Sequence, residues 1–301
     1  MQAPPSLVRA TESPRSRLMR LWSSRRFRLV VRALALGWIV FFWLWLIGAQ
    51  SNFAEVDAEA YWGFSLDELY RDVQLGDQDA FLYSPVVAYL FVPFSSLPWE
   101  VFYAILAAVN LAALVWILRP ELAALSLFLV PVSNEVARGN IHILIAAAIV
   151  LGFRYSGTWA WVLLTKVTPG VGLLWFGVRR EWRALAIALG VTGALVAASF
   201  VLTPDLWFRW FAVLTGSVEI TRPSVLEIPV LPRLAAAAVL MAIAAWRSWF
   251  VVVPVAAMLA LPAIWVNSLA MLVAVVPLLR YSTRHRSAPA PGESASPSAT
   301  E

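Results

Sequence analysis

The sequence predicts an all-α fold, a polytopic transmembrane helical bundle of about eight to ten spans or half-spans. Of its 301 residues, 61% are hydrophobic and only 14% are charged, whereas about a quarter of the residues in soluble globular proteins are charged. Several apolar runs reach the length of a bilayer span, and no short alternating strand pattern repeats. Because helices satisfy their own backbone hydrogen bonds in lipid, these runs indicate helices. A water-soluble enzyme is excluded.

The residue types that are missing exclude several kinds of chemistry. The chain has no cysteine, so disulfides, thiol nucleophiles, iron–sulfur clusters and cysteine-bound zinc are ruled out. Its two histidines, His142 and His285, are too few for a His-rich metal site. We therefore expect no cofactor. A divalent metal stays open, without support from the sequence.

The net charge of +5 comes from 22 arginines and a single lysine. These residues gather at the ends of apolar segments, as they do where they set the orientation of a membrane protein. They do not form the basic face of a nucleic-acid-binding domain. The sequence therefore predicts the lipid bilayer as a partner and no nucleic acid.

The N-terminal segment is basic and is followed by the first apolar run. Residues 1–32 contain eight arginines and one acid, Glu12. We predict that residues 1–28 form a disordered cytoplasmic N-terminus and that residues 29–49 form the first span. A cleaved secretory signal is the alternative, but the apolar run is long and rich in tryptophan, unlike a short signal core.

The charge reverses between residues 50 and 83. Eight of the eighteen acids lie there, opposed only by Arg71. Aromatic and apolar residues recur within this stretch at three- and four-residue spacings, which is typical of short amphipathic helices on a membrane surface. We predict that residues 50–83 form an extracytoplasmic loop that contains such helices.

The positions of the arginines also decide how the later segments cross the bilayer. If residues 84–97 crossed fully, Arg119 and Arg154 would lie outside; as a half-helix in the outer leaflet, residues 84–97 leave both arginines in the cytoplasm. Fourteen residues at 1.5 Å each are also too short for a full span. Arg138 is then placed on the outer side as an exception to this rule, which makes its segment a candidate for function.

The domain between residues 29 and 280 then contains a series of further segments. We expect spans at residues 99–118, 121–133, 141–153, 184–202 and 228–246, two short helices over 158–178, two more segments over 249–279, and an interfacial helix within 204–228. Residues 281–301 are rich in Arg, Pro, Ser and Ala, so we predict a disordered cytoplasmic tail. Both termini are expected in the cytoplasm.

Asp57 is the candidate catalytic base. It lies eight residues beyond the first span, which keeps it close to the membrane surface. A carboxylate placed there can accept a proton from a hydroxyl group. The alternative is an ordinary solvated acidic loop.

Lys166 is the only lysine, and it lies in the apolar segment around Thr165-Lys166-Val-Thr168-Pro169. An ionisable group inside the membrane costs about 3 kcal/mol and is a functional-site candidate by default. Thr168 followed by Pro169 indicates an N-cap and a helix start, whose free N–H groups and dipole favour an anion. We predict a phosphate site here; a lysine that extends to the interface is the alternative.

Two further polar segments face the same outer side. In Asn134-Glu135-Val-Ala-Arg138-Gly139-Asn140-Ile-His142, the planar guanidinium of Arg138 can hold an anion. A plain polar turn is the alternative. Tyr83-Ser84-Pro85 predicts a second helix start, aimed at the outer cavity. Together these features favour an anionic, lipid-embedded substrate and a hydroxyl nucleophile.

Four motifs, in order over about residues 34–215, resemble glycosyltransferase family 87, the polyprenyl-phosphate-mannose-dependent mannosyltransferases of the C-type superfamily. Asp57 with Tyr61 and Tyr70 resembles the acidic first loop of that family. This sequence departs from the family pattern at three positions: Ser84 replaces a proline, Asn140 a glutamine and His142 an asparagine. If the patch with Asn140 and His142 binds the sugar, its two departures leave the donor hexose open. The other three motifs are Phe81-Leu-Tyr83-Ser-Pro85 with Pro93 and Leu97-Pro98, Arg138-Gly139-Asn140-Ile-His142, and Thr165-Lys166-Val-Thr-Pro169 before Arg179-Arg180.

The resemblance implies the C-type fold and transfer of a hexose, with mannose expected, from a polyprenyl-phosphate carrier to a glycan or glycolipid hydroxyl. The reaction is expected on the extracytoplasmic face of the cell membrane. A transporter or lipid flippase is the alternative, and a non-catalytic membrane subunit is a third possibility. The residue roles implied are Asp57 as base, Lys166, Arg138 and Thr168 on the donor phosphate, and Glu59, Tyr61, Tyr83, Asn140 and His142 on the sugar or acceptor.

Overall fold

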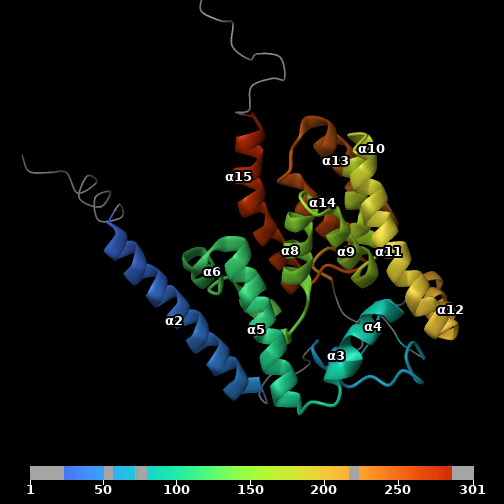
Figure 1. Cartoon of the computed structure of the whole chain (residues 1–301), viewed down its shortest axis with the longest axis horizontal. Helices are drawn as coiled ribbons and strands as arrows, with labels where there is room; N and C mark the ends of the chain where they lie inside the picture. The colour runs from blue at the N-terminus through green and yellow to red at the C-terminus, as the bar shows by residue number, and fades with distance from the viewer. Residues whose placement is uncertain (1–23, 51–56, 72, 74–79, 217–223, 287–301) are drawn as a thin grey trace, which may run out of the picture.

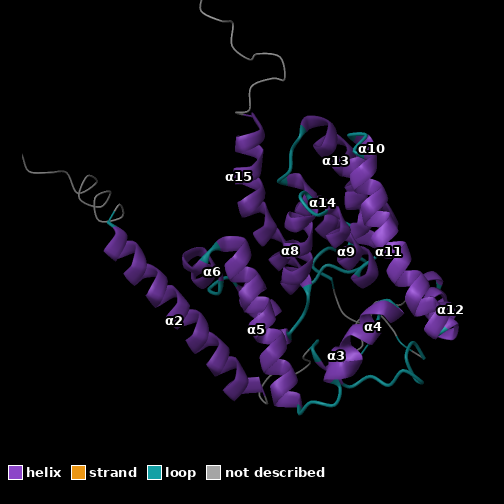
Figure 2. Cartoon of the chain, in the orientation of Figure 1, coloured by secondary structure: helices purple, strands orange, loops and turns teal. Residues whose placement is uncertain are grey.

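The computed structural model of the chain describes residues 24–50, 57–71, 73, 80–216 and 224–286. Within these residues every regular element is a helix (Figure 2). The predicted all-α class is therefore confirmed. The segments 1–23, 51–56, 74–79, 217–223 and 287–301, with residue 72, lie outside the described part of the chain.

Several helices are long and apolar enough to cross a membrane. A sixth span results if the bent pair α7 (Val130–Arg138) and α8 (His142–Gly152) is counted as one, and two shorter apolar segments cover Pro85–Phe94 and Thr168–Val178. The described residues thus contain eight spans or half-spans, at the lower end of the prediction. The five long helices are α2 (Arg25–Ala49), α5 (Trp99–Leu118), α11 (Trp182–Leu202), α13 (Val230–Arg247) and Val266–Thr283, in which the 3-10 helix η5 (Val266–Ala274) continues into α15 (Val275–Arg286).

The outer helices bury one narrow stripe and expose the rest of their apolar surface. In α2, the buried residues Ala35, Ile39, Phe42 and Leu46 recur every three or four positions, which places them on one face of the helix. This helix packs against α5 and against α6 (Pro120–Ser126). On its other side Leu34 is 69% exposed. So much exposed apolar surface is typical of a protein that faces lipid.

The start of α2 and the end of α15 both lie away from α3 (Glu59–Trp62) and α4 (Pro85–Phe91) (Figure 1). In Figure 1 helix α2 runs downward from its blue start at the left and the red end of α15 lies at the top, whereas α3 and α4 lie lower in the view. This arrangement agrees with two termini on one side and the acidic loop on the other. The compartments that the two sides face stay a prediction.

The predicted span at residues 121–133 is wrong. The chain there forms the short helix α6, turns, and begins α7 at Val130 with Pro131 in its first turn. Proline lacks an N–H group and disfavours helix in the residue before it, so one continuous helix cannot form. Helix α8 then leaves α7 at an angle of 107°, and residues 139–141 form the break between them.

The short elements near the acidic loop agree in part with the predictions. A short helix is present within residues 84–97 as α4 and the 3-10 helix η2 (Val92–Phe94), and another within residues 204–228 as α12 (Pro204–Thr215). Their positions relative to the membrane stay predictions. Helix α12 holds the loop in place, because Arg209 donates to the Asp67 carbonyl at 2.9 Å and Trp210 to the Leu82 carbonyl at 3.1 Å. Within the described part of the loop, α3 is the single α-helix and is only four residues long.

The terminal boundaries also differ from the expected ones. Helix α2 begins at Arg25, and α15 continues to Arg286, so residues 281–286 are helical and not disordered as predicted. Ser282 is buried and its hydroxyl donates to the Leu278 carbonyl at 2.9 Å, which explains how a polar sequence prolongs the helix. Most of the two predicted disordered termini lies outside the described residues, so those domain assignments stay predictions.

Candidate active site

The site is built on the break between α7 and α8. Helix α7 ends at Arg138, and Gly139 adopts a left-handed conformation with φ of 65°, which suits glycine. A Cβ atom at Gly139 would lie 2.6 Å from the Cβ of Ala58. The absence of a side chain therefore lets the acidic loop approach the break, and the Ala58 N–H donates to the Arg138 carbonyl at 3.0 Å.

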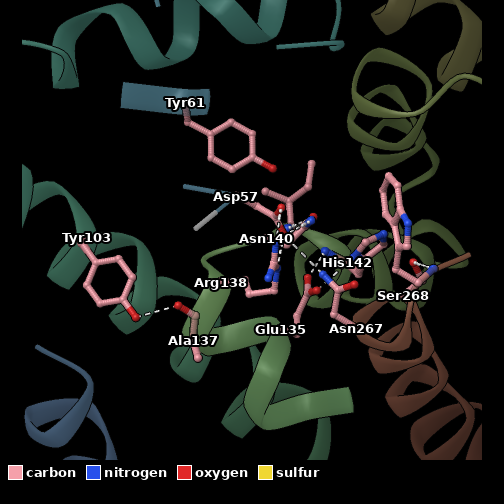
Figure 3. A network of polar contacts seen from close by, with 12 residues as sticks. Asp57, Tyr61, Tyr103, Glu135, Ala137, Arg138, Asn140, His142, Asn267 and Ser268 are labelled. Carbon is pink, nitrogen blue, oxygen red and sulfur yellow. Dashed lines mark hydrogen bonds and ion pairs between the residues drawn. The ribbon is translucent and has the colours of Figure 1, made fainter. Parts of the chain in front are cut away.

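This contact places the Asp57 carboxylate among three donors from distant parts of the chain (Figure 3). Arg138 donates from Nε to Oδ2 at 3.2 Å and from Nη2 to Oδ1 at 3.4 Å. Asn140 Nδ2 donates to Oδ2 at 2.9 Å, and Asn267 Nδ2 donates to Oδ2 at 3.4 Å. The carboxylate is therefore held in one orientation beside a permanent positive charge.

The two oxygens of Asp57 are not equivalent. Among the described residues, Oδ2 accepts from three side chains, whereas Oδ1 accepts from Arg138 alone. The Asp57 side chain is 28% exposed, so a bound molecule can reach it. Oδ1 is therefore the oxygen with lone pairs available to a substrate hydroxyl.

A second polar chain runs from α7 to Lys166. Glu135 and His142 are both fully buried. One Glu135 oxygen accepts from the His142 backbone N–H, and the other lies 3.0 Å from His142 Nδ1. On the far side of the ring, His142 Nε2 lies 2.8 Å from Lys166 Nζ. Lys166 is half-buried and lies where α9 (Trp159–Thr165) ends. Both polar chains therefore meet the same break, at residues 138–142.

Three tyrosines on the loop side of the site contact one another. The hydroxyls of Tyr61 and Tyr83 are 2.7 Å apart, and Tyr70 donates to the Tyr83 carbonyl at 2.5 Å. Burial raises the pKa of each of these phenols, so they stay neutral at physiological pH and act as hydrogen-bond donors and acceptors. In Figure 3 the hydroxyl of Tyr61 points toward Asp57.

Thr168 differs from its predicted geometry. It begins the 3-10 helix η4 (Thr168–Leu173), but the cap position falls on Val167 and no side-chain cap bond forms. The Thr168 hydroxyl oxygen is buried and has no hydrogen-bond partner among the described residues. The expected N-cap is therefore wrong, because Thr168 has already entered the helix and its side chain no longer reaches the free N–H groups of the first turn.

Ser84 and Glu59 lie at the edge of the site. Ser84 precedes α4, with Pro85 in the first turn as predicted, but its hydroxyl caps no N–H group. Its backbone N–H instead donates to the Leu164 carbonyl at 3.1 Å, which ties α4 to α9. Glu59 begins α3, two residues beyond Asp57.

Within the described residues, no group of three or more His, Cys, Asp or Glu side chains is arranged to hold a metal ion. The carboxylates of Asp57 and Glu135 instead have arginine, amide and imidazole partners. Whether the protein requires a divalent metal stays an open prediction.

Comparison with known proteins identifies the family. The model of glycosyltransferase family 87 matches residues 81–291, well over half of the chain. This chain belongs to glycosyltransferase family 87. The match includes Arg138, His142, Lys166 and Asn267, and it begins beyond Asp57. The family predicted from the resemblance is thus confirmed, although the match does not include the motif of Asp57, Tyr61 and Tyr70. With its long apolar helices the chain is a multi-pass membrane protein.

One curated relative is the polyprenol-phosphate-mannose-dependent alpha-(1-2)-phosphatidylinositol pentamannoside mannosyltransferase of Mycolicibacterium smegmatis (strain ATCC 700084 / mc(2)155). It is 24% identical to this family 87 chain in an alignment of 205 residues, and the match covers 59% of this chain. The chain spans about half the length of this relative. No solved structure matches.

Two residues of this family 87 site had no predicted role. Glu135 lies in the polar segment that the sequence analysis singled out. Only the bend between α7 and α8 shows that its partner is the imidazole of His142. Asn267 comes from the far end of the chain, 210 residues beyond Asp57. The sequence did contain a signal for Asn267. Asn267 and Ser268 are the only polar residues between positions 249 and 279, and polar residues inside membrane segments indicate candidate functional sites.

Proposed function

We propose that the chain transfers a hexose, with mannose expected, from a polyprenyl-phosphate carrier to a hydroxyl of a glycan or glycolipid. The reaction takes place on the extracytoplasmic face of the cell membrane. One observation carries the proposal. The α7–α8 break connects a partly exposed carboxylate, Asp57, to an ammonium group, Lys166, through residues 138–142. A base and a cation are the two groups that this transfer needs.

Asp57 serves as the base. As the acceptor oxygen attacks the anomeric carbon, its proton passes to Asp57 Oδ1, the oxygen with the fewest partners. The bond between the anomeric carbon and the phosphate oxygen breaks, and its electron pair leaves with the lipid phosphate. By analogy with the superfamily, the anomeric centre is inverted.

Lys166 and Arg138 stabilise the lipid phosphate as it gains negative charge. The Lys166 ammonium uses one N–H group on His142, and its other two have no partner among the described residues. Arg138 uses Nε and Nη2 on Asp57, and its Nη1 has no partner within the described part of the chain. Arg138 can therefore bind a phosphate oxygen while it orients the base. The unpartnered Thr168 hydroxyl, two residues beyond Lys166, is a third phosphate donor.

The sugar and acceptor contacts come from the loop side. Tyr61, whose hydroxyl points toward Asp57 (Figure 3), and Tyr83 present phenols, and Glu59 adds a carboxylate beside them. The side chain of Asn140 contacts the base directly. Its Nδ2 donates to Asp57, and its Oδ1 accepts from the Ile141 N–H at 2.7 Å. Asn140 therefore affects acceptor binding through the position of Asp57.

The experiment is a transfer assay with the full chain purified in lipid nanodiscs. Labelled polyprenyl-phosphate mannose and glucose are supplied in turn, with a glycolipid fraction as acceptor. Asp57→Asn is expected to lower turnover by about 10² to 10⁴-fold, the usual contribution of a general base. Asp67→Asn, a change to another acid of the same loop, is the matched control and is expected to leave turnover unchanged.

Two outcomes would contradict the proposal. Normal turnover of Asp57→Asn removes Asp57 from the mechanism. A folded wild-type protein that binds the donor lipid but transfers neither hexose favours a non-catalytic membrane subunit instead.

A further inference from the structure

We infer that Glu135 and His142 are positioning residues, which hold the Lys166 ammonium toward the phosphate of the lipid donor. This inference rests on the proposed function, in which Lys166 binds that phosphate. It assigns His142 to the orientation of the lysine and not to contact with the sugar or acceptor. It gives the buried Glu135 carboxylate a role in the reaction.

The burial of His142 supports this assignment. The residue is 0% exposed, and both of its ring nitrogens already have partners inside the protein. A sugar hydroxyl therefore has neither a path to the ring nor a free nitrogen to bind. Lys166 is the one member of this chain that is not fully buried, so it is the group that faces the site.

Glu135 determines the tautomer of the histidine. Its two oxygens accept from the backbone N–H and from the ring of the same residue, His142. A carboxylate only accepts hydrogen bonds, so Nδ1 carries a proton. In the neutral ring Nε2 is then bare and accepts from Lys166, which keeps its proton because an amine is the stronger base. The hydrogen bonds thus run from the Glu135 carboxylate through the His142 ring to the Lys166 ammonium and fix its position.

The geometry of Lys166 explains why such a device is needed. A lysine side chain has four flexible bonds and loses considerable conformational freedom when it is fixed. The residue lies in extended backbone between α9 and η4, with φ of −137° and ψ of 105°. The hydrogen bond to His142 fixes the end of this side chain and leaves its other two N–H groups directed away from the ring.

The chain composition makes a direct test practical. The protein has only two histidines and one lysine, so ¹⁵N-histidine labelling gives two rings, and His285→Gln leaves His142 as the single labelled ring. In the full chain in nanodiscs, we expect Nδ1 to be protonated and Nε2 to be bare. Lys166→Met is expected to move the Nε2 resonance. A ring protonated on Nε2, or an Nε2 chemical shift that does not change in Lys166→Met, would overturn the inference. This holds whether or not the protein transfers a hexose.

Kinetics then separate positioning from contact. Glu135→Gln and His142→Gln are expected to raise KM for the polyprenyl-phosphate hexose about tenfold, the loss expected for a hydrogen bond to a charged group. The kcat is expected to fall as well, because a displaced Lys166 also stabilises the departing phosphate less well. Thr165→Val is the matched control, since Thr165 is buried beside Lys166 but donates only to the Trp161 and Val162 carbonyls of its own helix.

Two results would contradict this role. A wild-type kcat together with an unchanged KM for the donor in His142→Gln would mean that the ring does not position Lys166. A rise in KM for the acceptor alone would mean that His142 contacts the sugar or the acceptor. Where Glu135→Gln lowers the folded yield, the tautomer measurement on the wild-type protein decides the question. If wild-type protein shows the expected tautomer but no transfer, the proposed function fails. The hydrogen bonds that connect Glu135 through His142 to Lys166 are then still confirmed.

Discussion

Two arginines of the helical bundle have opposite environments. Arg233, on α13, is 3% exposed and donates to the carbonyls of Ile228, Leu259, Leu261 and Pro262 at 2.5 to 3.2 Å. Arg138, at the end of α7, is 23% exposed and pairs with a carboxylate.

These environments show which arginine stabilises the fold and which one can act on a substrate. An arginine that is buried and surrounded by backbone carbonyls joins chain segments, here the start of α13 to the turn before η5. An arginine that is half-exposed, is paired with an acid and keeps one nitrogen without a partner among the described residues can act on a substrate. The two arginines differ in their partners, which are backbone carbonyls for Arg233 and a carboxylate for Arg138.

The largest expected effect is on the stability of the Arg233 region. Arg233→Met leaves four carbonyls without their donor, so we expect the free energy of unfolding to fall by about 3 kcal/mol or more. Tryptophan fluorescence during thermal unfolding in detergent measures this change. Arg247→Met, at the exposed end of the same helix, is the control. An unchanged unfolding midpoint for Arg233→Met would mean that the carbonyls find other donors.

Arg138→Met is expected to show the reverse pattern. Removing the guanidinium leaves Asp57 less firmly oriented and the lipid phosphate with one donor fewer, so turnover should fall about 10²-fold. The unfolding midpoint should stay within a few degrees of wild type. The transfer assay and the fluorescence measurement, applied to both arginine variants, test the comparison. A stable Arg138→Met protein with full turnover would show that this arginine is structural as well.

A smaller effect is expected from the backbone that brings Asp57 to Arg138. Gly139→Ala places a side chain at φ of 65° and within 2.6 Å of Ala58, a conformation that costs about 1–2 kcal/mol before the clash is counted. We expect lower turnover, because the loop that carries Asp57 moves away. Gly190→Ala on α11, where a Cβ atom meets nothing within 4 Å, is the control. Equal turnover for the two variants would refute the role of this close approach.

The smallest effect is expected at a third arginine, Arg32, which is 49% exposed and pairs with Glu121 at 2.8 Å. The backbone N–H of Glu121 and then Arg32 lower the pKa of the Glu121 carboxyl. A lowered pKa means that the stabilisation is present above the unfolded-state pKa and is lost as the pH falls through the folded-state value. Exposed pairs contribute less than about 1 kcal/mol, so Glu121→Gln should scarcely move the midpoint at pH 7, and the difference should vanish in acid. A large shift at pH 7 would contradict this ranking.

The sequence predicted the parts of the fold that depend on local composition. The runs at residues 29–49, 99–118, 184–202 and 228–246 correspond to α2, α5, α11 and α13, because hydrophobicity and length can be read from a continuous segment. It failed at residues 121–133, where Pro131 and the turn before it divide an apolar run into two short helices. Average hydropathy does not register a single backbone break.

The candidate residues show the same division. Asp57, Arg138 and Lys166 stood out by themselves, because charged groups next to or inside apolar segments are rare and costly. Their partners did not: Asp57 meets Asn267 across 210 residues, and Lys166 reaches the buried Glu135 only through His142. These contacts depend on the 107° angle between α7 and α8 and on η5, which packs against both helices.

By itself, the sequence determined that this chain lies in a membrane, which segments are apolar enough to cross it, and which few charges are out of place there. Only the tertiary structure decided which of those charges meet, which oxygen of Asp57 stays available, and which arginine serves structure and which serves chemistry. The physical reason is that burial preference belongs to each segment of the chain, whereas a hydrogen bond requires two groups within about 3 Å. That distance is set by how the helices pack and bend.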